Sequence, residues 1–307
     1  MNIRKNRLKI VLGGIAVCMC MACGGSDTKD YWGDTSNGGK EEPTENPNAS
    51  KPRYIWIDAA ANFPDFANSK ENIARDLALA KDAGFTDIVV DVRPTTGDVL
   101  FKTNIVDQVK FMYAWIGSNY TKVERTATWD YLQAFVDEAR KQGLRIHAAI
   151  NTFVGGNQID GGTGLLYRDQ SKAEWATQMN MQTGIVSVMN TSESTKFFNP
   201  AHPEVQTFLC DLLKDLASYD LDGIFLDRGR FLNLQTDFSE ESRKQFEEYM
   251  GGIRIQNYPD DILLPGASSL PATYPKYLTK WLEFRAKVIY DFMQKARTAV
   301  KGVKPGI

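Results

Sequence analysis

Short apolar runs alternate with amphipathic stretches along the chain from residue 53 onward. The apolar runs are typical of buried strands, and helical spacing of apolar positions predicts a helix after each one. The predicted strands cover 54–58, 86–93, 144–151 and 221–227, and the predicted helices cover 69–83, 129–142, 203–219 and 276–301. Strands and helices that alternate in this way predict a parallel sheet with right-handed crossovers.

Local signals mark the ends of several predicted elements. Ser69 stands where a helix N-cap is expected, and its hydroxyl can accept a hydrogen bond from the first turn. Gly84 and Gly143 follow two of the predicted helices, where a residue with a left-handed backbone is favoured. Pro94 ends the second predicted strand because proline lacks the N–H that a strand ladder needs.

The connections are asymmetric. Long loops follow the predicted strands, whereas turns of two to three residues follow the helices. This is typical of a (β/α)8 barrel of the TIM type, whose site is built from the loops after the strands. A doubly wound open sheet is the competing fold, but no glycine-rich phosphate turn follows the first strand. Four strand–helix units make half of a closed barrel, so we expect a barrel truncated after about four units. The alternative is that later elements are irregular and that the hydrophobic pattern does not reveal them.

The N-terminus has the pattern of an export signal. Four basic side chains precede an apolar run over 10–22, which is too short to span a bilayer as a helix. Met21-Ala22-Cys23-Gly24 resembles a bacterial lipobox, with Cys20 where leucine is usual. We therefore expect a lipoprotein signal peptide over 1–22, lipidation at Cys23, a flexible tether over 23–52 and a barrel domain over 53–307. Simple secretion is the alternative to a lipid anchor in the outer membrane, which would face the periplasm or the cell surface.

Composition narrows the classes of partner. The formal net charge is −2, and residues 1–22 carry only basic charges, so the rest of the chain is acidic, which argues against a nucleic-acid partner. With two histidines and no HExxH pattern, we expect no metal site and no cofactor. Cys210 is the only cysteine in the sequence after Cys23. It lies on the apolar side of a predicted helix, so we expect it to be a buried structural thiol.

Polar residues stand at the ends of the predicted strands, which meet at one mouth in a barrel. Asp227 is the strongest candidate for a catalytic residue. It ends a rigid apolar strand, which places its carboxylate at the rim of the barrel, and glycosidases need carboxylates beside the scissile bond. We expect Arg228 and Arg230 to hold Asp227 ionised, which suits a nucleophile. The alternative is an Asp–Arg pair that only stabilises the strand end.

Further candidates would line a sugar site. Near strand ends lie Asp58, Arg93, His147, Asn151, Arg228 and Arg230, and Trp115 belongs to an aromatic cluster in the loop after the second strand. Each of these roles has a structural alternative. Asp58 and Arg93 could simply pair with each other, His147 could be part of the barrel wall, and Trp115 could belong to a small aromatic core within its loop.

Four motifs occur in a familiar order: Asp91-Val-Arg-Pro-Thr-Thr-Gly-Asp98, Gly143-Leu-Arg-Ile-His-Ala-Ala-Ile-Asn151, Phe198-Asn-Pro-Ala-His-Pro-Glu-Val205 and Tyr219-Asp-Leu-Asp-Gly-Ile-Phe-Leu-Asp227. Together they resemble the glycosyl-hydrolase-like family 10 proteins, exported barrel proteins and lipoproteins of Bacteroidota type that are related to the α-amylase superfamily. The resemblance covers about residues 53–307. Where family members often continue Asp-Asp-Tyr, this chain has Asp227-Arg228-Gly229.

The resemblance implies a glycoside hydrolase acting on poly- or oligosaccharide by a retaining mechanism, with Asp227 as the nucleophile. It also implies a proton donor on a later strand, which we expect beyond Ile307. The rival hypotheses are a catalytically inactive glycan-binding surface lipoprotein and a purely structural surface protein.

Overall fold

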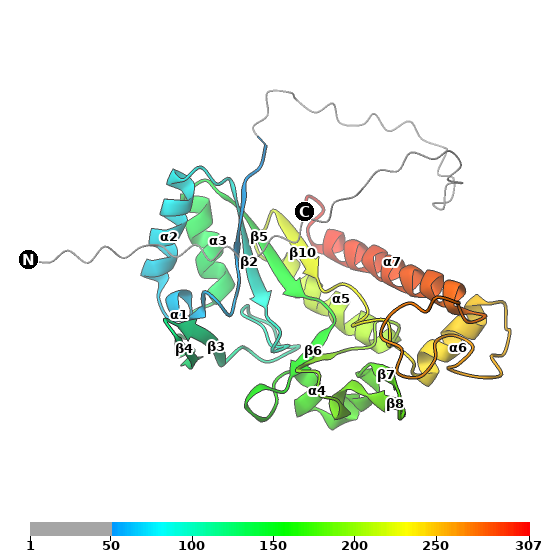
Figure 1. The fold of residues 1–307 in the computed structure, drawn as a ribbon. Helices are drawn as coiled ribbons and strands as arrows, with labels where there is room; N and C mark the ends of the chain where they lie inside the picture. The colour runs from blue at the N-terminus through cyan, green and yellow to red at the C-terminus, as the bar shows by residue number, and fades with distance from the viewer. Residues whose placement is uncertain (1–50) are drawn as a thin grey trace, which may run out of the picture. The chain divides into compact units, whose positions relative to one another are not determined.

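The computed structural model describes residues 51–307, and these form a parallel sheet covered on one face by helices (Figure 1). The strands, in spatial order, are β1 (Tyr54–Ile57), β2 (Asp87–Arg93), β5 (Arg145–Asn151) and β10 (Gly223–Asp227). The longer helices that follow them are α2 (Lys70–Asp82), α3 (Tyr131–Lys141), α5 (Pro203–Ala217) and α7 (Leu278–Val303). The four predicted strands and the four predicted helices are therefore confirmed.

Side-chain alternation explains why the helices cover one face of the sheet. Ile88, Val90, Ile146 and Ala148 alternate along β2 and β5, and all are fully buried in the main hydrophobic core. Apolar side chains of α2, α3, α5 and α7 pack into the same core. Burying such surface contributes roughly 25 cal/mol per Å², so this helix-covered face supplies much of the drive to fold.

Helix capping follows the sequence signals. The Ser69 hydroxyl accepts a hydrogen bond from the Asn72 N–H at 3.1 Å, and the Asp130 carboxylate accepts one from the Gln133 N–H at 3.1 Å. Each bond satisfies an N–H that the first helical turn leaves unpaired. The predicted N-cap at Ser69 is confirmed.

The long loops that follow the strands contain elements that the apolar pattern did not predict. Three antiparallel pairs form there: β3 (Phe111–Ile116) with β4 (Asn119–Glu124), β6 (Val154–Asn157) with β9 (Thr195–Phe197), and β7 (Gln178–Met181) with β8 (Gly184–Ser187). Shorter helical elements are α1 (Phe63–Phe66), α4 (Leu165–Arg168), α6 (Glu240–Tyr249) and the 3-10 turns Ile159–Gly161, Gln170–Trp175 and Val188–Asn190. All of these elements lie in the segments that follow the carboxyl ends of the four sheet strands.

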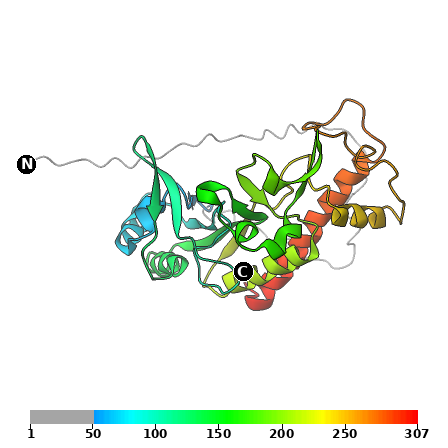
Figure 2. The ribbon, with the colours of Figure 1, turned by 90° about the horizontal axis from the view of Figure 1, so that it is seen from below.

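A second hydrophobic core lies away from the sheet. It joins α6 and the segment 250–277 to the first half of α7, and the two helices lie side by side in Figure 2. Trp281 and Phe284 of α7 are buried against Phe246 of α6. The Phe246 and Trp281 rings meet edge to face at 4.9 Å, a favourable arrangement for aromatic pairs. This core ties the loop after β10 to α7.

The opposite face of the sheet is aromatic and partly open. Tyr54, Trp56 and Phe225 remain 47%, 46% and 37% exposed on that face, with rings in edge contact. β1 and β10 form the two edges of the sheet as far as the described residues show. Parallel sheets are generally covered on both faces, so this face is unusual for its class.

The predicted signal peptide, the lipidated Cys23 and nearly all of the predicted tether lie outside the described residues. Within residues 51–307, no helix combines the length and the apolar character needed to cross a bilayer. Cys210 is a free thiol on α5 that is partly buried, so the expectation of a buried thiol is met only in part.

Candidate active site

A small polar cavity lies at the carboxyl end of the sheet, where the strands deliver their last side chains. It has a volume of about 150 Å³. Three aspartates from three different strands line it: Asp58 follows β1, Asp91 belongs to β2 and Asp227 ends β10. Asn151, Arg228 and the ring of Trp56 complete much of its wall.

Asp227 stands exposed at the rim of this cavity. Its carboxylate accepts a hydrogen bond from the Arg228 N–H at 2.7 Å, and its carbonyl accepts one from the Thr152 N–H at 2.8 Å. Arg228 has a left-handed backbone with φ of +48°, a conformation that is uncommon for a residue with a side chain. The backbone thus turns sharply away from the strand directly after the carboxylate.

The two arginines after Asp227 behave differently from the expectation. The Arg230 guanidinium donates to the carbonyl oxygens of Phe231 and Leu232 and lies 5.7 Å from the Phe197 ring. None of the ion pairs between described residues involves Asp227. The alternative of an Asp–Arg ion pair at the strand end is therefore wrong. Arg230 does not line the cavity, which corrects its predicted place in the sugar site, whereas Arg228 does line it.

Asp91 is the carboxyl group of the cavity that the sequence-based candidates did not include. It is 7% exposed, and it accepts a hydrogen bond from the Arg93 N–H at 3.2 Å. Burial raises its pKa to about 7, and repulsion from Asp58 adds to the effect. The sequence did carry a signal, because Asp91 follows an apolar run near the end of a predicted strand, as Asp227 does.

Arg93 does not reach the cavity, which corrects its predicted role in sugar binding. It is fully buried, and its guanidinium donates to the carbonyl oxygens of Asn151, Thr152 and Val154. A β-bulge explains the change: Asp91 pairs with Ala149 but Arg93 pairs with Ile150. The extra residue moves Arg93 off the face that Asp91 occupies. Arg93 instead organises the start of the loop after β5, and burial lowers its pKa to about 10.

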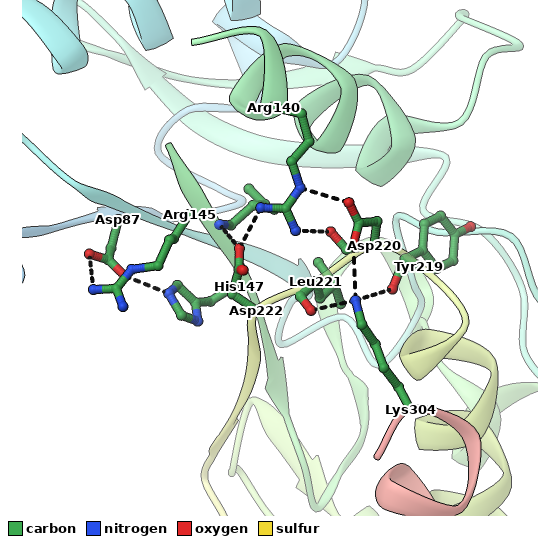
Figure 3. A network of polar contacts seen from close by, with 10 residues as sticks. Asp87, Arg140, Arg145, His147, Tyr219, Asp220, Leu221, Asp222 and Lys304 are labelled. Carbon is green, nitrogen blue, oxygen red and sulfur yellow. Dashed lines mark hydrogen bonds and ion pairs between the residues drawn. The ribbon is translucent and has the colours of Figure 1, made fainter. Parts of the chain in front are cut away.

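His147 also lies outside the cavity. Its Nε2 atom is 2.8 Å from the Asp87 carboxylate, and Arg145 pairs with the same carboxylate at 2.8 Å. Figure 3 shows this group beside a second network, in which Arg140 and Lys304 hold Asp220. Both networks stand at the amino end of the strands, the end opposite to the cavity. The prediction that His147 lines the sugar site is wrong. His147 lies two residues before Ala149 on β5, and it is therefore further from the carboxyl end of the sheet than the residues that line the cavity.

The remaining candidates divide between the cavity and its surroundings. Asp58 lines the cavity, and its carboxylate accepts a hydrogen bond from the Ala61 N–H at 2.7 Å. Asn151 is 6% exposed, lines the cavity and donates to the Arg93 carbonyl oxygen at 2.9 Å. Trp115 lies on the β3–β4 hairpin, 68% exposed, with its ring 5.3 Å from that of Tyr120.

The hairpin aromatics border a second hollow. Phe111, Tyr113 and Tyr120 line a groove of about 320 Å³ together with Asn157 and Gln158. Ala60, Thr95 and Met112 line both this groove and the aspartate cavity, so the two are contiguous. The rings and the amide side chains of this groove provide both stacking surface and hydrogen-bonding groups.

Within residues 51–307, no group of three or more histidine, cysteine or acidic side chains has an arrangement that could hold a metal ion.

Solved structures of glycosidases are similar to this chain in fold. A TM-score of 0.52 relates the chain to the α-L-fucosidase isoenzyme 2 of Paenibacillus thiaminolyticus, at 18% identity over 84% of this chain and 32% of that one. The catalytic domain of the β-amylase of Paenibacillus polymyxa gives a TM-score of 0.51 at 13% identity, over 82% of this chain and 63% of that one. At these identities the likeness shows the fold alone, an α/β fold like that of the TIM-barrel-like glycosidases.

Sequence comparison identifies the family. An S-layer-related protein of Niallia circulans is 31% identical over 258 residues, which are 81% of this chain but only 16% of that protein. This chain therefore spans about a sixth of that relative. The model of the glycosyl hydrolase-like 10 family matches residues 51–307. The chain belongs to the glycosyl hydrolase-like 10 family.

Proposed function

We propose that this domain is a glycoside hydrolase that acts on poly- or oligosaccharide, with Asp227 as the nucleophile of a retaining mechanism. One observation carries the proposal: a strand-end carboxylate, exposed at the rim of a polar cavity, faces further carboxyl groups across that cavity. Glycosidases need two carboxyl groups placed on either side of the scissile bond. The family and the fold of its glycosidase neighbours support the same chemistry.

The binding of the glycan would use both hollows. Asp58, Asn151 and Arg228 present polar groups to a sugar in the cavity. The aromatic groove next to it would hold neighbouring sugar units, with Trp115 extending the ring surface of the hairpin. Sites of this kind combine apolar surface with a few placed polar groups.

A second candidate is a catalytically inactive surface protein that binds glycan. The description of its relative as an S-layer-related protein favours a surface role. This hypothesis predicts glycan affinity without release of sugar.

We also propose that the four strand–helix units are the first half of a (β/α)8 barrel. The exposed rings of Tyr54, Trp56 and Phe225 and the two open edge strands support this, because further strands would cover both. We further propose export and lipidation at Cys23 on the lipobox-like sequence. Metabolic labelling with a radioactive fatty acid should mark the wild-type chain and not Cys23→Ser.

The release of reducing ends from a panel of plant, algal and host glycans tests the enzymatic function. Asp227→Asn is the informative variant, and Asp211→Asn on the exposed surface of α5 is its matched control. Release by the wild type and by Asp211→Asn but not by Asp227→Asn is the expected result. Release by all three proteins removes Asp227 from the mechanism. Binding of a glycan without release by any of them favours the inactive protein.

A further inference from the structure

Asp91 occupies the floor of the cavity between two other carboxyl groups. The pairing of Ile57 with Val90 continues to place Asp58 beside Asp91 on the neighbouring strand, and neighbouring strands are about 4.8 Å apart. Asp91 pairs with Ala149, whereas Asp227 pairs with Asn151, one step nearer the mouth on the same face. Asp91 therefore lies one layer deeper than Asp227, and the small side chain of Ala149 leaves the space between them open.

The groups that face Asp91 supply little positive charge. Asp58 faces it from β1 and Asp227 from β10, and both repel a negative charge there. From α3, the buried Tyr131 hydroxyl interacts electrostatically with Asp91 and Asp58 and has no hydrogen-bond partner. The Arg93 guanidinium attracts the Asp91 carboxylate but is held by backbone carbonyl oxygens, and the other arginine beside Asp91, Arg228, lines the same cavity.

Two peptide N–H groups favour the ionised form of Asp91. Those of Arg93 and Ala59 act in this direction, but burial and the neighbouring carboxylates outweigh them, so that the pKa rises to about 7. A carboxyl group of this kind keeps its proton near neutral pH and can act as a general acid. It also lines the cavity, where a bound sugar could reach it.

We propose that Asp91 is the proton donor of the hydrolysis in which Asp227 is the nucleophile. This inference rests on the proposed function and differs from the sequence-based expectation of a donor on a later strand. Asp58 acts as a positioning residue: its charge keeps the proton on Asp91.

The proton and electron pairs balance within the two aspartates and water. In the first step the Asp91 proton moves to the glycosidic oxygen as its bond to the anomeric carbon breaks, and an Asp227 oxygen bonds to that carbon. The leaving sugar departs as an alcohol, and Asp91 becomes a carboxylate. In the second step Asp91 takes a proton from water, the water oxygen bonds to the anomeric carbon, and Asp227 is released as a carboxylate. No further reactant is required.

The experiment compares two substrates of the sugar identified in the release assay: the natural oligosaccharide and its 2,4-dinitrophenyl glycoside. Asp91→Asn keeps the shape of the side chain but has no acidic proton. We expect kcat for the oligosaccharide to fall by about 10²- to 10⁴-fold. The aryl glycoside should retain bond cleavage, because dinitrophenolate departs without protonation, and azide should restore turnover of its glycosyl-enzyme.

A second variant covers the case in which Asp91→Asn fails to fold. Asp58→Asn leaves Asp91 in place and removes a neighbouring negative charge, so the alkaline limb of the pH profile of kcat/KM should move to lower pH. An equal loss on both substrates in Asp91→Asn, or an unmoved alkaline limb in Asp58→Asn, overturns the role of Asp91 alone. Absence of sugar release by the wild-type protein overturns the proposed function and this role together.

Discussion

Replacement of Asp91 by asparagine should stabilise the protein in a manner that depends on pH. The raised pKa of about 7 means that the folded state retains a proton that the unfolded state releases above about pH 4. Below pH 4 both states bind the proton, so the carboxyl group has no differential effect. Between pH 4 and 7 only the folded state binds it, so the free energy of unfolding falls as pH rises, by about 1.4 kcal/mol per pH unit.

The magnitude follows from the width of that window. A shift of about three pH units corresponds to a cost of up to roughly 4 kcal/mol, fully present above pH 7. The asparagine side chain of the Asp91→Asn variant would not carry this cost, and its carbonyl oxygen can still accept the Arg93 N–H that Asp91 accepts at 3.2 Å. The unpaired amide N–H₂ group offsets the gain by about 1 kcal/mol. We therefore expect Asp91→Asn to be slightly destabilised at pH 4 and more stable than the wild type by about 2–3 kcal/mol at pH 8.

Urea unfolding at pH 4, 6 and 8, followed by circular dichroism, measures this difference. Asp211→Asn, which replaces an exposed aspartate on α5, is the control and should follow the wild type at each pH. A difference between Asp91→Asn and the wild type that stays constant from pH 4 to 8 would refute the argument, because it would show that Asp91 has the same pKa in both states.

Three further changes test the structure and the site. Arg93→Met leaves three loop carbonyl groups without their donor and should lower the free energy of unfolding by about 3 kcal/mol in urea titrations, whereas Arg93→Lys should recover part of the loss. Ser69→Ala removes the cap of α2 and should cost about 1 kcal/mol in the same assay, while Ser69→Asp should remain near the wild type. Trp115→Ala should change stability by less than about 0.5 kcal/mol, because the ring is 68% exposed, yet weaken glycan binding in calorimetry. Unchanged glycan affinity in Trp115→Ala would remove this residue from the binding surface.

Local patterns were sufficient to predict the strand–helix framework. The apolar runs that became β2 and β5 and the helical spacing that became α2 and α3 are properties of a few successive residues, as is the cap at Ser69. The hairpins in the loops escaped the same analysis. The strand Asn119–Glu124 is largely exposed and has no apolar run, so its pairing with β3 depends on its partner and not on its own pattern.

By itself, then, the sequence determined the order of strands and helices, the parallel sheet and the placing of Asp58, Asn151 and Asp227 at its carboxyl end. Only the tertiary structure decided which other polar residues join them. The bulge in β2 turns Arg93 away from the cavity, and His147 pairs with Asp87 at the amino end of the sheet. The importance of Asp91 arose from burial and from the charges on β1 and β10. Burial and cross-strand charge come from segments distant in the chain, so the spacing of residues along one strand cannot contain them.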